Sequence, residues 1–501
     1  MPNLALALSE TAAMYPSHPA IRLEKSGLSY AELDRASARV AGLLRSRGFQ
    51  PGDRVGVMLP NVPQFAVAYY GVLRAGGVVV PMNPLLKERE VDYYVQDSGA
   101  RFLFAWDEVP AATTDAAGTA GAGLIEVAPG EFERLIATFD AELDIASRAA
   151  EDTAVILYTS GTTGHPKGAE LTHFNLSRNA QVTATTLLGL DTADVILGCL
   201  PFFHAFGQTC CLNAAVQARS TITLMSRFDA SGALDIIASE GVSVFEGVPT
   251  MYSALLEQQT RHPRQTGSLR VCISGGAALP VETLHRFEET FNCAILEGYG
   301  LSETSPVASF NHPGRRRKAG SIGTPITGVD LRLIDNEGRD VPAGEPGEIA
   351  IRGHNVMKGY WHKTDETAAA FVDGWFRTGD IAKVDEDGYY YIVDRKKDLI
   401  IRGGFNVYPR EVEEVLYEHP AVLEAAVIGL PHESLGEEIG AAVALREGQS
   451  ASPEELQQFV KARLAAYKYP RKVWLVDSLP QGPTGKIMRR LVVAPEETSA
   501  K

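Results

Sequence analysis

The sequence predicts an α/β protein with a large N-terminal domain, in which parallel-rich sheets are flanked by helices, and a small, mobile α+β C-terminal domain. Short β-branched or apolar runs alternate with helical patterns over most of the chain, as is typical of parallel sheets that are covered on both faces. The composition changes near residue 394. The length of 501 residues also exceeds that of a single domain of roughly 150 residues.

The alternation of strands and helices begins near the N-terminus. Ser29 and Glu32 form a capping-box pattern ahead of a helix whose apolar face carries Leu33, Val40 and Leu44. A low-complexity stretch at 111–123 predicts an exposed, mobile loop. Buried strands are expected at 55–59, 78–80, 154–158, 221–224, 242–245 and 271–274.

A charged segment with paired glycines follows a predicted hairpin at residue 394 and separates it from a new α+β pattern. Beyond it, Pro409 is suited to the first turn of a helix, and Ser452 with Glu455 forms another capping box. These signals predict an N-terminal domain over 1–393, a hinge over 394–397 and a C-terminal domain over 398–501.

The composition excludes several classes of protein. The chain has 47 basic and 62 acidic residues and a net charge of −15, which argues against sequence-independent binding of nucleic acid. The sequence contains no run of about 18 apolar residues, so it predicts no membrane span. Peripheral contact with a membrane stays open. Five cysteines without a CxxC pair favour buried thiols in a reduced, cytoplasmic compartment. Monomer and homodimer are both compatible with the sequence.

The most informative segment is 158–168, which reads YTSGTTGHPKG and directly follows a predicted strand. Glycine amides and hydroxyl groups in such a loop can wrap phosphate oxygens, and Lys167 adds a positive charge. It is not a Walker A loop, because no Gly-Lys-Ser/Thr sequence is present. The complete pattern resembles the phosphate-binding signature of the AMP-forming adenylating superfamily, which includes acyl-CoA synthetases, adenylation domains of peptide synthetases and luciferases. The candidate phosphate ligands are Thr159, Ser160, Gly161, Thr162, Thr163, Gly164 and Lys167.

The segment GYGLSET at 298–304 resembles the second signature of that superfamily. The resemblance implies that Tyr299 lies against adenine, that Ser302 contacts phosphate and that Glu303 holds Mg²⁺, a hard cation that prefers carboxylate oxygen. The triplet at 275–277 resembles the segment that passes adenine and the acyl group. The nucleotide-binding candidates here are Gly275, Gly276, Ala277, Gly298, Tyr299, Gly300 and Ser302.

Two further segments resemble motifs of the same superfamily. RTGD at 377–380 implies that Asp380 accepts both ribose hydroxyls, and DRKKD at 394–398 implies that Arg395 also reaches the ribose. The resemblance makes Lys397 the pivot of a rotating C-terminal domain. Gly403 and Gly404 would then leave room for the pantetheine arm of coenzyme A.

The segment GPTGK at 482–486 resembles the C-terminal signature, whose lysine enters the active site for the first half-reaction. Lys486 would bridge the substrate carboxylate and the α-phosphate and stabilise the charge of the transition state. The resemblance places His204 beside the acyl pocket. Relatives that activate amino acids have Asp where this chain has Ala205, so a carboxylic acid with an uncharged tail is expected.

The resemblance implies an AMP-forming acyl-CoA synthetase that uses ATP, Mg²⁺ and coenzyme A. Lys486, Glu303 and His204 are the catalytic candidates. The segment 201–209 and the apolar stretch 242–251 resemble those of bacterial fatty-acid ligases, which implies a medium- or long-chain fatty acid. Aryl acids of the coumarate or benzoate type are the second choice. Three competing functions are loading of a carrier-protein thiol, a luciferase-like monooxygenase reaction and non-catalytic binding.

Overall fold

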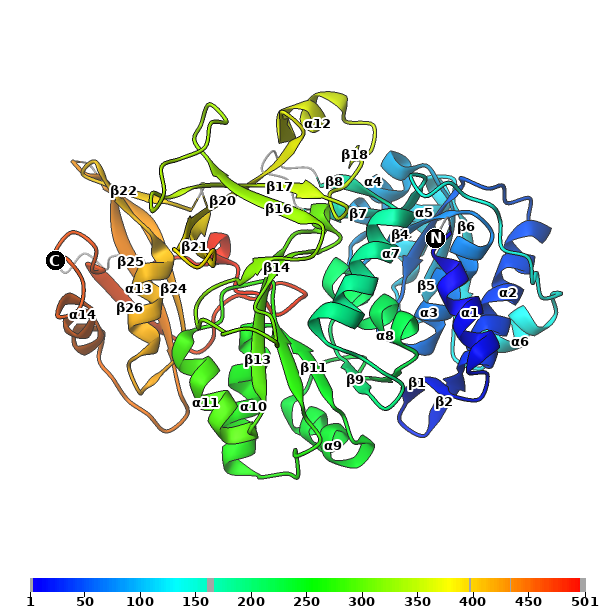
Figure 1. The fold of residues 1–501 in the computed structure, drawn as a ribbon, viewed down its shortest axis with the longest axis horizontal. Helices are drawn as coiled ribbons and strands as arrows, with labels where there is room; N and C mark the ends of the chain where they lie inside the picture. Colours follow the sequence, from blue (N-terminus) through cyan, green and yellow to red (C-terminus); the bar gives the residue numbers. More distant parts are fainter. Residues whose placement is uncertain (1–2, 160–165, 396–397, 433, 496–501) are drawn as a thin grey trace.

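Four β-sheets organise the computed structural model, which describes residues 3–159, 166–395, 398–432 and 434–495 (Figure 1). The first has the strand order β18-β8-β7-β4-β3-β5-β6. Its strands from β7 to β6 pair in parallel, and β8 and β18 extend it by antiparallel pairing. Its strands are β3 (Arg54–Met58), β4 (Val78–Pro81), β5 (Ala100–Trp106), β6 (Gly123–Val127), β7 (Thr153–Thr159), β8 (Lys167–Thr172) and β18 (Gly359–Tyr360).

The second sheet has the order β15-β14-β13-β12-β11-β9-β10-β1-β2. It is parallel from β13 to β1 and antiparallel at both edges. Its strands are β1 (Pro19–Leu23), β2 (Ser26–Ser29), β9 (Val195–Gly198), β10 (Thr221–Leu224), β11 (Val244–Gly247), β12 (Val271–Ser274), β13 (Ala294–Gly300), β14 (Val307–Phe310) and β15 (Thr324–Pro325).

Helices cover these two sheets, as Figure 1 shows. The α-helices of this part are α1 (Ala5–Met14), α2 (Tyr30–Ser46), α3 (Pro63–Arg74), α4 (Glu88–Ser98), α5 (Ala111–Thr119), α6 (Glu131–Ala137), α7 (His173–Val182), α8 (Ala214–Ala218), α9 (Ala230–Glu240), α10 (Pro249–Arg261), α11 (Val281–Phe291) and α12 (Thr364–Ala370). Two π-helices, η1 (Thr183–Leu187) and η2 (Gly207–Asn213), and the short 3₁₀-helix η3 (Ser302–Thr304) complete it.

The largest hydrophobic core lies between the two large sheets. It joins Val55 and Val79 of the first sheet to Ile196 and Ile273 of the second. The hydroxyl of Tyr70 on α3 donates a hydrogen bond of 2.9 Å to Asn213 at the end of η2. A buried polar pair of this kind contributes about 1 kcal/mol when satisfied, so η2 is held firmly within the core.

A third sheet is antiparallel and has the order β16-β17-β20-β19, with β21 pairing β20. Its strands are β16 (Val329–Ile334), β17 (Gly347–Gly353), β19 (Phe371–Val372), β20 (Trp375–Val384) and β21 (Tyr390–Arg395). The turn expected at 385–388 connects β20 and β21, and the predicted hairpin is therefore confirmed.

The fourth sheet contains only strands that follow residue 399 and has its own core around Val427, Ala441 and Leu456. Its strands are β22 (Ile400–Arg402), β23 (Phe405–Val407), β24 (Val422–His432), β25 (Gly436–Leu445) and β26 (Lys472–Val476), and its helices are α13 (Pro409–Tyr417), α14 (Pro453–Lys461) and the 3₁₀-helix η4 (Arg489–Leu491). The division into 1–393, 394–397 and 398–501 stays a prediction, and Lys397 lies outside the described residues.

The mixed α/β architecture with parallel-rich sheets is confirmed, and so are both capping boxes, at Ser29 and Ser452. The prediction of a mobile loop at 111–123 is wrong. The structure places α5 there, followed by β6, because Thr113 and Ala117 are buried and β6 pairs in parallel with β5. None of the helices within the described residues combines the length and apolar composition that a membrane span requires.

Candidate active site

Glu303 lies where β7, η3 and β18 meet. Thr159 at the end of β7 donates a hydrogen bond of 3.3 Å to Glu303 Oε1, and the Tyr360 hydroxyl on β18 donates one of 3.0 Å to the same oxygen. The carboxylate is largely buried. These two donors hold one oxygen of Glu303 and therefore orient the carboxylate.

Lys167 faces the same group. It opens β8 directly opposite Thr159 in the antiparallel register, and its Nζ lies 5.4 Å from the centroid of the Tyr360 ring. Ser160, Gly161, Thr162, Thr163 and Gly164 lie outside the described residues, so their predicted role stays a prediction. Tyr360 follows a glycine but belongs to none of the recognised motifs. It was therefore not expected from the sequence.

The glycines of the 298–304 segment allow a close approach of the chain. A Cβ on Gly298 would meet the Phe310 ring at 2.1 Å, and a Cβ on Gly300 would meet the carbonyl oxygen of Pro306 at 1.8 Å. Any side chain would force β13 and β14 apart. Glycine at these positions therefore keeps Tyr299 and Glu303 in place.

Tyr299, Asp380 and Arg395 form a second group. The Tyr299 hydroxyl donates a hydrogen bond of 2.6 Å to Asp380 Oδ2, and Arg395 Nε lies 3.1 Å from Asp380 Oδ1. Asp380 and Arg395 are opposite each other in the β20–β21 register. Burial and the neighbouring Asp380 charge raise the pKa of Tyr299 well above its usual range. The tyrosine is therefore a hydrogen-bond donor at neutral pH.

Lys486 lies close to this second group. Burial lowers the pKa of Lys486 to about 8, and the positive charge of Arg395 contributes to the decrease while Asp380 opposes it. Thr250 Oγ1 on α10 donates a hydrogen bond of 2.8 Å to the carbonyl oxygen of Gly485. The loop that carries Lys486 is thus held against the large core.

His204 lies close enough to Lys486 for the charge of the lysine to affect the pKa of the histidine. Burial, with a smaller effect of Lys486, lowers the pKa of His204 to about 4, so the imidazole is neutral near pH 7. Its Nδ1 accepts a hydrogen bond of 3.3 Å from the Phe206 amide. Buried Asn61 donates to the carbonyl oxygens of Gly198 and Leu200, which fixes the segment leading to His204.

Gly275, Gly276 and Ala277 follow β12 and lie near His204. A Cβ on Gly275 would be 3.1 Å from the Phe206 ring, and one on Gly276 would be 3.6 Å from Val248. Val248 also lies 3.1 Å from the corresponding position of Gly485. This triplet therefore lies between the His204 segment and the Lys486 loop, and its contact with adenine and the acyl group stays a prediction.

Gly403 and Gly404 form the turn between β22 and β23, with φ values of 56° and 84°. Two consecutive positive φ values favour glycine in a tight hairpin. The flanking side chains of Ile401 and Phe405 are 52% and 56% exposed. No interaction among the described residues joins this hairpin to Lys486.

Arg489 forms a cluster of ion pairs that was not expected from the sequence. It lies 3.0 Å from Asp394 Oδ1, 3.6 Å from Asp398 Oδ2 and 2.5 Å from Glu413 Oε2. Asp394 is the first residue of the predicted hinge, Asp398 follows the hinge directly, and Glu413 lies on α13. The cluster joins the end of β21 to the segment that carries Lys486.

The residues fit a magnesium ion that is bound mainly by substrate. Among the described residues no group of at least three His, Cys, Asp or Glu side chains could hold a metal. Mg²⁺ commonly uses one or two protein carboxylates together with substrate phosphates. Glu303 supplies one carboxylate, and its Oε2 receives neither of the two hydrogen bonds described above.

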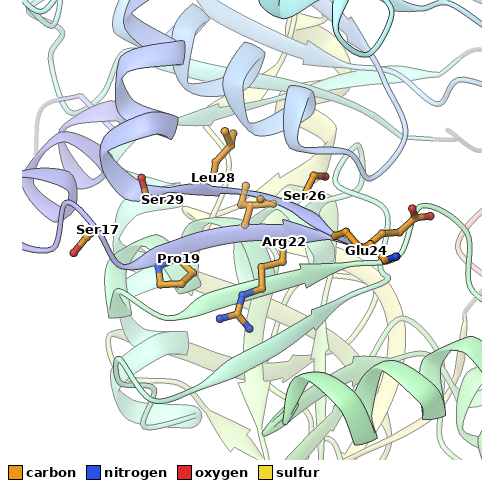
Figure 2. A pocket seen from close by; sticks show the side chains of 10 residues that line it. Ser17, Pro19, Arg22, Glu24, Ser26, Leu28 and Ser29 are labelled. Carbon is orange, nitrogen blue, oxygen red and sulfur yellow. The ribbon is translucent and has the colours of Figure 1, made fainter.

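A surface hollow of about 320 Å³ lies elsewhere, at the β1–β2 hairpin (Figure 2). Pro19, Arg22, Glu24 and Ser26 are among the residues that line it. It shares no residue with the groups described above and lies at the β2 edge of the nine-stranded sheet. We assign it no role in the reaction.

Comparison with known proteins identifies the family of this chain. Residues 8–361 match the AMP-binding enzyme family, and residues 411–486 match the AMP-binding enzyme C-terminal domain. The chain is 38% identical to a long-chain-fatty-acid–CoA ligase of Bacillus subtilis, over 99% of this chain and 95% of that protein. It is 39% identical to a feruloyl-CoA synthase of an Amycolatopsis species, over 95% and 96%.

A solved structure gives the same result. ATP-bound MatB from Rhodopseudomonas palustris is 35% identical and superposes with a TM-score of 0.91, over 98% of this chain and 97% of that one. The mixed α/β architecture, with a large N-terminal part and a smaller C-terminal part, is that of adenylate-forming enzymes. The chain belongs to the AMP-binding enzyme family.

Proposed function

We propose that this protein is an acyl-CoA synthetase that activates a medium- or long-chain fatty acid through an acyl-adenylate and transfers it to coenzyme A. The coarser class, an AMP-forming acid–thiol ligase acting on a carboxylic acid, ATP and coenzyme A, follows from family membership. The similarity to a fatty-acid ligase supports the substrate. A cytoplasmic location is part of the proposal, and the five buried, unbridged cysteines support it.

The position of Lys486 carries the proposal for the first half-reaction. The substrate carboxylate attacks the α-phosphorus of ATP, an acyl–phosphate bond forms, and pyrophosphate leaves. Lys486 neutralises the growing negative charge, and Asp380 with Arg395 holds the ribose. Glu303 would hold Mg²⁺, which would balance the charge of the phosphates. His204 is neutral and lines the acyl side without repelling Lys486.

The second half-reaction requires Lys486 to be replaced by the thiol substrate. The thiolate of coenzyme A attacks the acyl carbon, a thioester forms, and AMP leaves with the electron pair of the broken bond. We propose that the C-terminal domain (398–501) turns about the hinge 394–397 at Lys397 and presents Gly403 and Gly404. The exposed hairpin beside Phe405 supports this, because it is free to change its contacts.

An aryl acid is the second candidate substrate, because the relatives include a feruloyl-CoA synthase at 39% identity. Ala205 is fully buried beside His204 and offers no carboxylate to an α-ammonium group. Amino acids, and transfer to a carrier protein, are therefore less favoured.

The test is a screen for pyrophosphate release over fatty acids of increasing length, aryl acids and amino acids, with and without coenzyme A. Acyl-CoA formation, detected by mass, identifies the thiol acceptor. We expect turnover with fatty acids and a thioester product only when coenzyme A is present. Turnover with amino acids alone would overturn the proposed substrate class.

A further inference from the structure

Glu246 is a fully buried acid within the segment 242–251, whose residues are otherwise mostly apolar. Within the described part of the chain, neither of its carboxyl oxygens has a hydrogen-bond partner. Native proteins satisfy most buried polar side chains, so an orphaned carboxyl requires an explanation. Neither half-reaction, as proposed, uses this side chain.

The strand register shows which way Glu246 points. It pairs with Ile273 across β11 and β12, and Ile273 belongs with Val244 to the largest core. Successive side chains alternate across a sheet, so Glu246 faces that core, whereas Phe245 faces the smaller cluster behind it. The core face is the one covered by η2, which contributes Cys210 and Cys211 to it.

Electrostatic contacts agree with this direction. Burial raises the pKa of the Cys210 and Cys211 thiols, and the nearby Glu246 carboxyl raises both further. Gln208 Oε1 and Thr209 Oγ1, also on η2, are buried without a partner in the described residues. The face between β11 and η2 therefore gathers unsatisfied polar atoms inside an apolar core.

Short stretches of chain connect this face to the candidate catalytic residues. Glu246 is followed by Val248 at the N-cap of α10 and by Thr250 in its first turn, and both contact the Gly485 loop. The π-helix η2 begins three residues after His204, and π-helical turns frequently mark functional sites. If the carboxylate of the acyl group lies between Lys486 and His204, as proposed above, we expect its tail to lie between β11 and η2.

We propose that Glu246 is a specificity-determining residue that hydrogen-bonds a hydroxyl group on the tail of the carboxylic acid substrate. An unsubstituted alkyl tail would leave the Glu246 carboxyl group unpaired. A hydroxyl group on the tail can accept a hydrogen bond from the O–H of Glu246 and donate one to its C=O. The inference rests on the proposed acyl-CoA synthetase reaction. It narrows the substrate to hydroxylated acids, either aliphatic or aromatic.

Protonation of Glu246 favours a hydroxyl over an ammonium group. Burial raises the pKa of Glu246 to about 8, so the side chain is mostly neutral near pH 7. A neutral carboxylic acid offers one donor and one acceptor, which match a hydroxyl. An ionised carboxylate would instead match a charged amine.

The test compares pairs of acids that differ by one hydroxyl. One arm uses a medium-chain fatty acid and its ω-hydroxy form, and the other uses cinnamic acid and its 4-hydroxy form. The ratio of kcat/KM for pyrophosphate release within each pair is measured for the wild type, Glu246→Met and Glu246→Gln. We expect a preference for one hydroxylated acid of about 10- to 100-fold, lost in Glu246→Met and partly kept in Glu246→Gln.

Glu297→Gln is the matched control. Glu297 is also buried with an unpartnered oxygen, but it pairs with Ser274 and therefore lies on the opposite sheet face. Glu297→Gln should change kcat/KM for the two acids of a pair by the same factor. Thermal melting checks folding, and Glu246→Met should melt no lower than the wild type, because it removes an unpaired buried group.

Each other outcome contradicts the inference in a distinguishable way. An unchanged ratio in Glu246→Met, or an equal loss for both acids, would overturn the specificity role. A preference for an amino-substituted acid over its hydroxyl analogue would contradict the assignment of a hydroxyl group as the partner of Glu246. Absence of pyrophosphate release with every acid would instead refute the proposed function itself.

Discussion

Thr250 donates a hydrogen bond of 2.8 Å from its hydroxyl to the carbonyl oxygen of Gly485, the residue before Lys486. Thr250 lies in the first turn of α10, which packs on the nine-stranded sheet, and Gly485 belongs to the C-terminal segment. One polar contact thus connects the large core to the loop of the candidate catalytic lysine. We expect this arrangement to serve the adenylation step.

Replacement of Lys486 by alanine should separate the two half-reactions. Loss of its positive charge should lower acid-dependent pyrophosphate release by about 100-fold or more. Thioester formation from supplied acyl-adenylate should stay within a few-fold of the wild type. Lys461→Ala on α14 is the control and should leave both rates unchanged. Equal loss of both steps in Lys486→Ala would rule out the rotation of the C-terminal domain.

Thr250→Val should weaken only the first half-reaction. The substitution keeps the shape of the side chain and removes one neutral hydrogen bond, worth about 1 kcal/mol or about fivefold in rate. Pyrophosphate release measures the effect, and thioester formation from acyl-adenylate should not fall. Thr260→Val on the same helix, where the hydroxyl bonds Leu256 within α10, is the matched control. A similar decrease in that variant would show that α10 stability, and not the Gly485 contact, is responsible.

Asp380→Asn tests the proposed contact with the ribose. The variant weakens the pair with Arg395 and changes an acceptor of the Tyr299 hydroxyl, so the KM for ATP should rise by about tenfold. The wild type should prefer ATP to 2′-deoxy-ATP, and the variant should lose most of that preference. Asp387→Asn in the β20–β21 turn is the control. A retained preference in Asp380→Asn would place the ribose elsewhere.

The pKa of Lys486, lowered to about 8, predicts how activity changes with pH. Above that value the lysine loses its proton and its charge, so kcat/KM for ATP should decrease by about tenfold per pH unit. Bound ATP is anionic and favours the charged lysine, so the decrease in kcat should begin at higher pH. Rates measured between about pH 6 and pH 10 test this. Lys486→Arg should remove the alkaline decrease, and its persistence would assign the titration to another group.

Much of the fold follows from local signals. The capping box at Ser29 fixed the start of α2 because its two hydrogen bonds are made within four residues. The short apolar runs became buried parallel strands, because such runs are typical of strands that are covered on both faces. The stretch 111–123 was mispredicted, because small residues carry no strong preference and packing against neighbouring elements decided its structure.

The candidate site divides in the same way. Lys167, Tyr299, Glu303, Asp380 and Lys486 were found from short motifs, since each motif carries its chemistry in consecutive residues. Tyr360, Thr250 and Arg489 were missed, because their contacts join segments that are 57 to 235 residues apart along the chain. No local pattern records such a pairing.

The sequence by itself determined the class of protein, the order of its motifs and the residue types that we expect to handle phosphate, ribose and metal, because these depend on neighbours along the chain. Only the tertiary structure decided that Lys486 lies beside Asp380 and His204, and that an unpaired acid faces η2. Both features join segments that are distant along the chain. The pKa shifts of Lys486, His204 and Glu246 depend on distance in space and on exclusion of water, which only the folded chain defines.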